Sequence, residues 1–170
     1  MHPPITLRPV RVEDEPFLYR VYVGTREDEL APLGWDEARK EQFLRMQFDA
    51  QHRFYQEQFP AADFQIILSG AHAIGRLYVD RREDEIRIVD IALLREHRNA
   101  GVGGALMGDL LAEAARDRKP VRIHVERHNP ALRLYERLGF VRIGDNGVYF
   151  LMEWSADGSP GTSSTVRAGT

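Results

Sequence analysis

The 170-residue chain contains no cysteine, which excludes disulfide bonds, thiolate metal ligands and cysteine nucleophiles. It also lacks any apolar run that approaches the roughly 18 residues of a membrane-spanning helix. The first residues, MHPPITLRPV, have neither the basic nor the hydrophobic part of a signal peptide. These absences predict a soluble, cytoplasmic protein with no membrane partner.

No charge sign dominates either. The chain has 23 Lys plus Arg against 26 Asp plus Glu, a formal charge of −3. This balance gives no support for nucleic-acid binding driven by counterion release, so no nucleic-acid partner is expected. A local basic patch beside an anionic cofactor remains compatible with it, and four arginines are candidates: Arg81, Arg82, Arg95 and Arg98.

The histidines form no recognisable metal site. His124 and His128 are four residues apart, but the pattern places them at a strand-to-loop junction and no carboxylate motif completes them. We therefore expect no metal cofactor.

Composition predicts one α/β domain, since 43% of the residues are hydrophobic and 29% are charged. From Ser155 onward Gly, Ser and Thr predominate, which predicts a domain over residues 1–154 and a disordered tail over 155–170. Periodicity and turn residues indicate a mixed sheet with helices on both faces. The expected strands are 5–10, 64–68, 73–79, 85–94, 121–125, 141–143 and 148–153, and the expected helices are 13–23, 36–58, 103–118 and 130–138. Asp36 is the expected N-cap of helix 36–58, and Gly139 is the expected C-cap of helix 130–138. The expected apolar residues are Phe43, Met46 and Phe54 in helix 36–58, with Phe59 directly after it, and Leu106, Leu110, Leu111 and Ala114 in helix 103–118.

The most informative stretch is IVDIALLREHRNAGVGGALMGDLLAEAARD, from Ile88 to Asp117. It predicts a buried strand, a polar turn with three glycines (Gly101, Gly103 and Gly104), and an amphipathic helix. Such a turn presents unpaired backbone N–H groups and a helix N-terminus to one point, where a phosphate binds. The sequence therefore favours a cofactor that carries a pyrophosphate.

Residues 98–103 fit the pattern R/Q-x-x-G-x-G/A, which by chance would arise in about one chain in five of this size. A tight strand-to-helix turn with no ligand is the alternative interpretation. The segment does not complete the dinucleotide fingerprint G-x-G-x-x-G, and it lacks the G-K-[ST] of a P-loop.

Two segments together, LLREHRNAGVGGALM and HNPALRLYERLGF, resemble the signatures of the GNAT superfamily of acetyl-coenzyme A-dependent N-acetyltransferases. The resemblance extends from about Ile5 to Trp154 in the order of the elements. It implies an α/β (α+β) fold with a mixed, mostly antiparallel seven-stranded sheet, flanked by helices and splayed between the fourth and fifth strands.

The resemblance also implies acetyl-CoA as co-substrate and a set of residues that bind it. The loop and helix start would hold the pyrophosphate, the fourth strand would pair with the pantetheine arm, and two later residues would contact that arm and its sulfur. The residues for the pyrophosphate are Arg98, Asn99, Ala100, Gly101, Val102, Gly103, Gly104 and Ala105. Those for pairing with the pantetheine arm are Ile91, Ala92 and Leu93. Asn129 would contact the arm and Tyr135 its sulfur.

The chemistry of acetyl transfer gives two of these residues a catalytic role. The N–H of Leu93 is the candidate donor to the oxyanion that forms at the thioester carbonyl. Tyr135 is the candidate donor to the departing thiolate, since a phenol of pKa near 10 protonates a thiolate of pKa near 8.5 at a cost of about 2 kcal/mol. The alternative for Tyr135 is a buried helix residue that packs under Leu138 and Phe140.

A primary amine is mostly protonated at neutral pH and must lose a proton before it attacks. Asp90 lies in an otherwise apolar strand, where it is either a base with a raised pKa or a salt-bridged structural residue. Glu126 is a second candidate base, although a solvated charge is the simpler interpretation. Ordered water in place of a dedicated base is a third possibility.

The resemblance implies an acceptor site near the long N-terminal helix, where the candidate residues are Tyr22, Arg26, Glu29, Trp35, Gln47, Gln51 and Tyr55. Gln47, Gln51 and Tyr55 recur at spacing four and share one helix face, which could also be merely solvated.

The leading hypothesis is an N-acetyltransferase that moves an acetyl group from acetyl-CoA to a primary amine of a small molecule or peptide, by direct attack in a ternary complex. A non-catalytic acyl-CoA-binding or sensor domain is the first alternative, and a protein- or RNA-directed modifier such as a toxin is the second. A homodimer is compatible with the sequence, because dimers are the commonest soluble oligomers.

Overall fold

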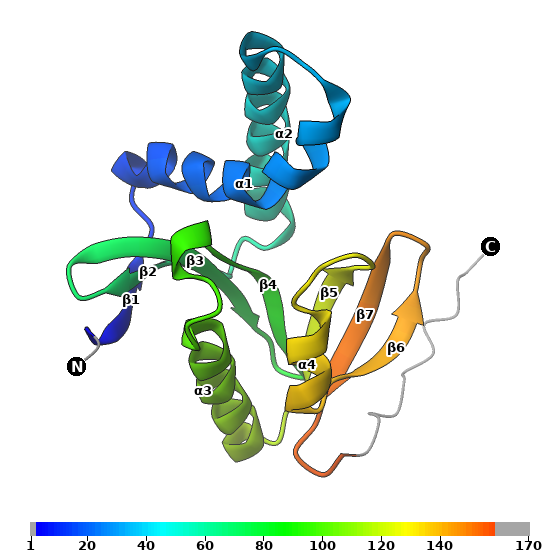
Figure 1. The fold of residues 1–170 in the computed structure, drawn as a ribbon. Helices are drawn as coiled ribbons and strands as arrows, with labels where there is room; N and C mark the ends of the chain where they lie inside the picture. The colour runs from blue at the N-terminus through cyan, green and yellow to red at the C-terminus, as the bar shows by residue number, and fades with distance from the viewer. Residues whose placement is uncertain (1–2, 159–170) are drawn as a thin grey trace. The chain divides into compact units, whose positions relative to one another are not determined.

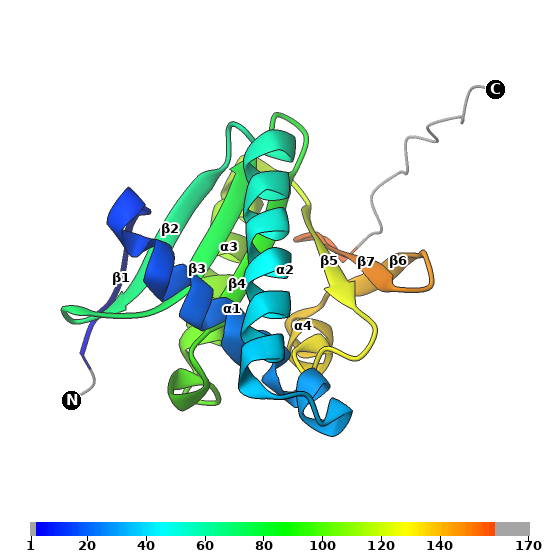
Figure 2. The same ribbon diagram turned by 90° about the horizontal axis from the view of Figure 1, so that it is seen from above.

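The structure is a computed structural model, which describes residues 3–158 (Figures 1 and 2). Its contacts divide the chain into two compact units. Among the described residues, the first unit consists of residues 3–80 together with Val89–Gly103, and the second consists of Arg81–Ile88 together with residues 104–158. The predicted tail from 159 to 170 lies outside the described residues.

The order of helices and strands agrees with the order expected from the sequence. The strands are β1 (Ile5–Pro9), β2 (Asp63–Ser69), β3 (His72–Arg81), β4 (Ile86–Leu93), β5 (Val121–Glu126), β6 (Val141–Asp145) and β7 (Tyr149–Trp154). The helices are α1 (Glu15–Leu30), α2 (Glu37–Gln58), α3 (Val102–Asp117) and α4 (Leu132–Leu138), with short 3-10 turns at Val12–Asp14, Ala31–Leu33 and Arg95–His97.

The strands form a seven-stranded sheet in the order β1-β2-β3-β4-β5-β7-β6. β4 and β5 are parallel, and the register between them covers Ile86–Ile88 of β4 and Val121–Ile123 of β5. The β1–β2, β2–β3, β5–β7 and β6–β7 pairs are antiparallel. The expected mixed, mostly antiparallel sheet is therefore confirmed.

In the first unit, α1 and α2 pack on β2 and β3. The cluster of buried side chains that joins them contains Leu18, Tyr22 and Leu30 of α1, Leu44 and Phe48 of α2, Ile66 of β2 and Tyr78 of β3. Helix α1 continues to Leu30, seven residues beyond the predicted end at Val23, because Gly24 causes no break and the chain turns only at Ala31–Leu33.

Helix α2 begins as predicted, since the Asp36 side chain accepts a hydrogen bond from the Arg39 N–H at 2.8 Å. The apolar stripe predicted for it is wrong at Met46 and Phe54, whereas Phe43 packs against the core. Met46 and Phe54 are 59% and 53% exposed, whereas Leu44 and Phe48 face the core. Apolar residues occur on more than one face of this polar helix, so periodicity alone could not select the buried face.

In the second unit, α3 buries the predicted residues Leu106, Leu110, Leu111 and Ala114, and Met107 as well. Helix α4 ends at Gly139, which has the positive φ of 103° that favours glycine at this position. The α4 residue Tyr135 lies at a ring-centroid distance of 5.8 Å from Phe140.

No helix in residues 3–158 combines the length and apolar character required to cross a membrane.

Candidate active site

The loop before α3 has the backbone of an anion-binding turn. Asn99 and Gly101 have positive φ values of 60° and 83°, and α3 starts at Val102 directly afterwards. The first N–H groups of any α-helix lack partners within the helix and carry the positive end of its dipole. The loop and the first turn of α3 therefore contain the backbone amides to which the sequence analysis assigns the pyrophosphate, and that binding stays a prediction.

Two glycines of this loop have empty surroundings. A Cβ built on Gly101 or Gly103 would meet no other described atom within 4 Å. Gly101 needs its glycine for the positive φ, but Gly103 lies in regular helix, where glycine costs about 0.5–1 kcal/mol relative to alanine. Packing within the described residues does not require glycine at position 103, and a ligand that approaches the backbone there stays a prediction.

Arg98 ties the loop to the rest of the first unit. Its Nε donates to the carbonyl of Leu93 at 3.0 Å, and its Nη2 donates to the carbonyl of Gly24 in α1 at 3.1 Å. Its backbone N–H donates to Arg95 O at 3.2 Å. These bonds give Arg98 a role in holding the loop, which the sequence did not reveal because both acceptors are backbone carbonyls.

Asp90, the candidate base on β4, lies in a polar cluster inside the first unit. An Nη2 atom of Arg76 lies 2.5 Å from Asp90 Oδ2 and donates to Gln51 Oε1 at 2.9 Å. The Tyr55 hydroxyl donates to the same Oδ2 over a longer distance of 3.4 Å. Asp90 is therefore salt-bridged, as one of its two interpretations from the sequence expects. The other interpretation, that Asp90 is a catalytic base, stays a prediction.

Arg76 is the residue of this cluster that the sequence analysis missed. It is 3% exposed and lies in the middle of β3, between Gly75 and Leu77. The signal was present, because a single arginine in the apolar run HAIGRLYV requires a buried partner. The sequence did not reveal that Asp90, 14 residues later, is this partner.

Burial and charge shift the pKa values in the cluster. Burial raises the pKa of the Tyr55 phenol far above its ordinary value, and the Asp90 carboxylate raises it further. Burial also raises the pKa of Tyr78, although the nearby Arg76 opposes the shift. For Arg76, burial lowers the pKa but the attraction of Asp90 outweighs it, so that the net shift is upward. Both phenols therefore stay protonated and Arg76 stays charged at neutral pH.

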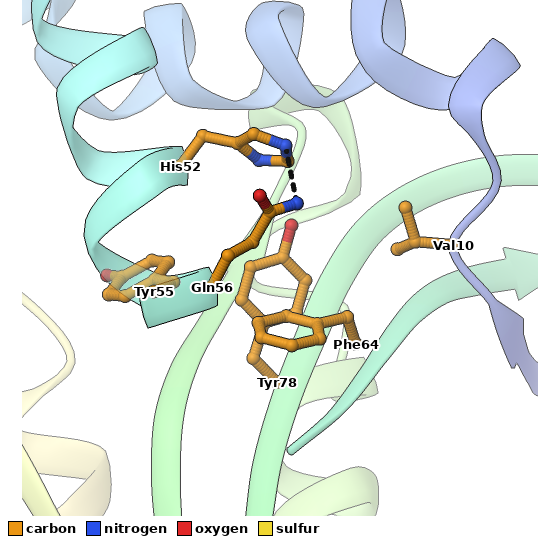
Figure 3. A pocket seen from close by; sticks show the side chains of 6 residues that line it. All are labelled: Val10, His52, Tyr55, Gln56, Phe64 and Tyr78. Carbon is orange, nitrogen blue, oxygen red and sulfur yellow. Dashed lines mark hydrogen bonds between the residues drawn. The ribbon is translucent and has the colours of Figure 1, made fainter. Parts of the chain in front are cut away.

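A cavity of about 160 Å³ lies beside this cluster in the first unit (Figure 3). It is lined by Val10, His52, Tyr55, Gln56, Phe64 and Tyr78. The Nε2 atoms of His52 and Gln56 are 3.1 Å apart, and in Figure 3 the Tyr78 hydroxyl points toward the Gln56 amide. The lining is mostly aromatic, with one histidine and one amide.

The remaining acceptor candidates do not join the cluster. Tyr22 is buried in the core, Arg26 pairs with Glu29 at 3.2 Å, and the Trp35 ring lies under Arg39 at 4.2 Å. Gln47 is exposed. Of the seven candidates, Gln51 and Tyr55 are the two that lie beside Asp90.

The second unit contains Gly104, Ala105, Asn129 and Tyr135. Asn129 Oδ1 accepts a hydrogen bond from the Ala131 N–H at 2.9 Å and so shapes the turn that starts α4. Tyr135 is 4% exposed and contacts Phe140, as its structural interpretation expects. Glu126, at the end of β5, is half-buried.

The family model described as an acetyltransferase (GNAT) domain matches residues 61–142, which include β4, the glycine loop and Tyr135. The chain carries a GNAT acetyltransferase domain. This confirms the resemblance and the expected enzyme class, an acetyl-CoA-dependent acyltransferase. None of the curated proteins compared with the chain matches it in sequence.

Solved structures share the fold at low sequence identity. PaiA N-acetyltransferase from Thermoplasma acidophilum, in complex with coenzyme A, is 18% identical with a TM-score of 0.67, over 89% of this chain and 99% of that one. An acetyltransferase from Thermus thermophilus is 22% identical, with a TM-score of 0.63 over 90% and 97% of the two chains. A GNAT-family acetyltransferase from Elizabethkingia anophelis with bound acetyl-CoA is 17% identical, with a TM-score of 0.53 over 89% and 97%.

Proposed function

We propose that the protein is an N-acetyltransferase that moves an acetyl group from acetyl-CoA to a primary amine by direct attack in a ternary complex. The acceptor is an amine-bearing small molecule or peptide. One observation carries the proposal: Gly103 stands in open space at the start of α3, next to a loop whose positive-φ residues favour an anion.

Residues 98–105, which we call the cradle, bind the pyrophosphate of acetyl-CoA through backbone amides. The amides from Asn99 to Ala105 are the donors, and Arg98 holds the loop through its bonds to Leu93 and Gly24. No side chain at Gly101 or Gly103 obstructs the approach of a phosphate, and the helix dipole favours its charge.

The pantetheine arm pairs with the backbone of Ile91, Ala92 and Leu93. The register of β4 with β5 ends at Ile88, before this segment begins. Asn129 contacts the same arm through its amide Nδ2, because its Oδ1 is already bonded to the Ala131 N–H.

Three groups serve the chemistry. The N–H of Leu93 donates to the oxyanion at the thioester carbonyl, and Asp90 accepts the proton of the amine directly or through water. Tyr135 donates to the departing thiolate. Glu126 remains an alternative acceptor for the amine proton.

The test is release of free thiol when the purified protein is incubated with acetyl-CoA and a panel of primary amines. An N-acetyltransferase releases thiol only when an accepted amine is present, and the acetylated amine appears in equal amount by mass spectrometry. Tight acetyl-CoA binding without thiol release for any amine would instead support the non-catalytic acyl-CoA-binding or sensor domain.

A further inference from the structure

Arg76 is the most thoroughly buried charge of the first unit that the proposed mechanism does not use. It lies on β3 and contacts Gln51 of α2 and Asp90 of β4, so that one side chain connects three elements of the unit. Within residues 3–158, its buried Nε has no hydrogen-bond partner.

Stability does not explain this arginine. A buried ion pair can often be replaced by apolar side chains of similar volume with no loss of stability, because removing both charges from water is expensive. An ion pair that apolar side chains could replace without loss of stability is a candidate for a role in the site.

The geometry around Asp90 indicates what that role is. Arg76 and Tyr55 both contact Oδ2, and among the described residues Oδ1 receives no hydrogen bond. Asp90 is 17% exposed at its side chain, against 4% for Arg76. The carboxylate is therefore held at one oxygen from the buried side, while the other can accept a hydrogen bond or a proton.

We propose that Arg76 is a positioning residue for acetyl transfer, which fixes Asp90 through Oδ2 and leaves Oδ1 to receive the acceptor amine. Gln51 fixes Arg76 in turn, through the bond from Nη2 to its amide oxygen. This inference rests on the proposed function, because it gives Asp90 the contact with the amine. It assigns no contact with the substrate to Arg76 itself.

The experiment is a double-mutant cycle with Arg76→Lys and Asp90→Asn. Lysine keeps the charge, but it carries it on a flexible stem with rotatable donors and loses the fixed guanidinium geometry in which Nη2 contacts both Gln51 and Asp90. We expect Arg76→Lys to lower kcat/KM for the amine by about 10-fold to 100-fold, with the KM for acetyl-CoA unchanged. The double variant should be no slower than Asp90→Asn alone, because residues that act through one another are not additive.

Arg45→Met is the matched control. Arg45 is an exposed residue of α2 whose guanidinium lies over the ring of Tyr19 in α1, and its replacement should leave both kinetic constants unchanged. If Arg76→Lys does not fold, Arg76→Met combined with Asp90→Asn removes both buried charges and should fold with the activity of Asp90→Asn.

Wild-type kcat/KM in Arg76→Lys, or losses that multiply in the double variant, would overturn the positioning role alone. A wild-type protein that releases no thiol with any amine would overturn the proposed function, and this assignment with it.

Discussion

Gly75 and Gly103 are both glycines of regular elements, yet their surroundings are opposite. A Cβ on Gly75 of β3 would lie 2.3 Å from the carbonyl oxygen of Ala92 and 2.9 Å from a methyl carbon of Leu93. A Cβ on Gly103 would meet no described atom within 4 Å. The first glycine is required by the chain itself, because it lets β4 approach β3 closely, whereas the second leaves room that the chain does not use.

We infer from this difference that Gly75 is required for folding and that Gly103 is available for binding. Substitutions at Gly75 should act on stability first, and substitutions at Gly103 should act on the ligand first. The following predictions test that separation, beginning with the largest effect.

Gly103→Glu should abolish coenzyme A binding, because its side chain occupies the cradle and its carboxylate repels the pyrophosphate. Isothermal titration calorimetry measures the affinity. Gly108→Glu is the matched control: it lies on the same helix, in equally open surroundings, outside the loop. Retained affinity in Gly103→Glu, or equal loss in both variants, would contradict the cradle.

Tyr135→Phe should lower kcat by about 100-fold, the lower range for loss of a proton donor, with little change in the KM for acetyl-CoA. The Phe140 contact is kept because phenylalanine preserves the ring. Steady-state kinetics with an accepted amine measures both constants. An unchanged kcat would return Tyr135 to its structural interpretation.

Gly75→Ala should destabilise the fold by about 1–3 kcal/mol, the usual range for overpacking, since a backbone carbonyl cannot move aside as a side chain can. Thermal unfolding without ligand measures it, at about 2–4 °C for each kcal/mol in a chain of this length. A variant as stable as the wild type would show that β3 and β4 are less tightly apposed at this point.

Gly103→Ala should have the smallest effect, and it should change stability and affinity in opposite directions. Alanine favours helix over glycine by up to about 1 kcal/mol, so the free protein should unfold at a slightly higher temperature. The added methyl group should weaken coenzyme A binding about tenfold. Gly108→Ala should give the stability gain without the loss of affinity; if affinity is also unchanged in Gly103→Ala, the methyl group does not meet the ligand.

Local patterns predicted most of the fold. The strict apolar face of α3 identified Leu106, Leu110 and Leu111 as buried, and Asp36 and Gly139 correctly marked a helix start and a helix end. These features depend on residues within one or two turns of each other, so the sequence contains their complete cause. The buried face of α2 failed, because its choice depends on β2 and β3, to which α2 contributes only Leu44 and Phe48 as buried residues.

The candidate site divides in the same way. The glycine loop was singled out because its residues are consecutive, and its role in binding pyrophosphate stays a prediction from its own backbone. The cluster around Asp90 was recognised only in part, because Arg76, Gln51 and Tyr55 reach it from two other elements. Sequence spacing says nothing about which of the many charged residues will meet inside the fold.

The sequence by itself determined the family, the order of the elements and the position of the glycine loop for which we propose a diphosphate, since each depends on short stretches of consecutive residues. Only the tertiary structure decided that Asp90 is paired with Arg76 and that Arg98 holds its own loop. It also decided that Gly75 is closely packed while Gly103 has open surroundings. These depend on which atoms are brought within a few ångströms across elements, and that is fixed by packing rather than by neighbours in the chain.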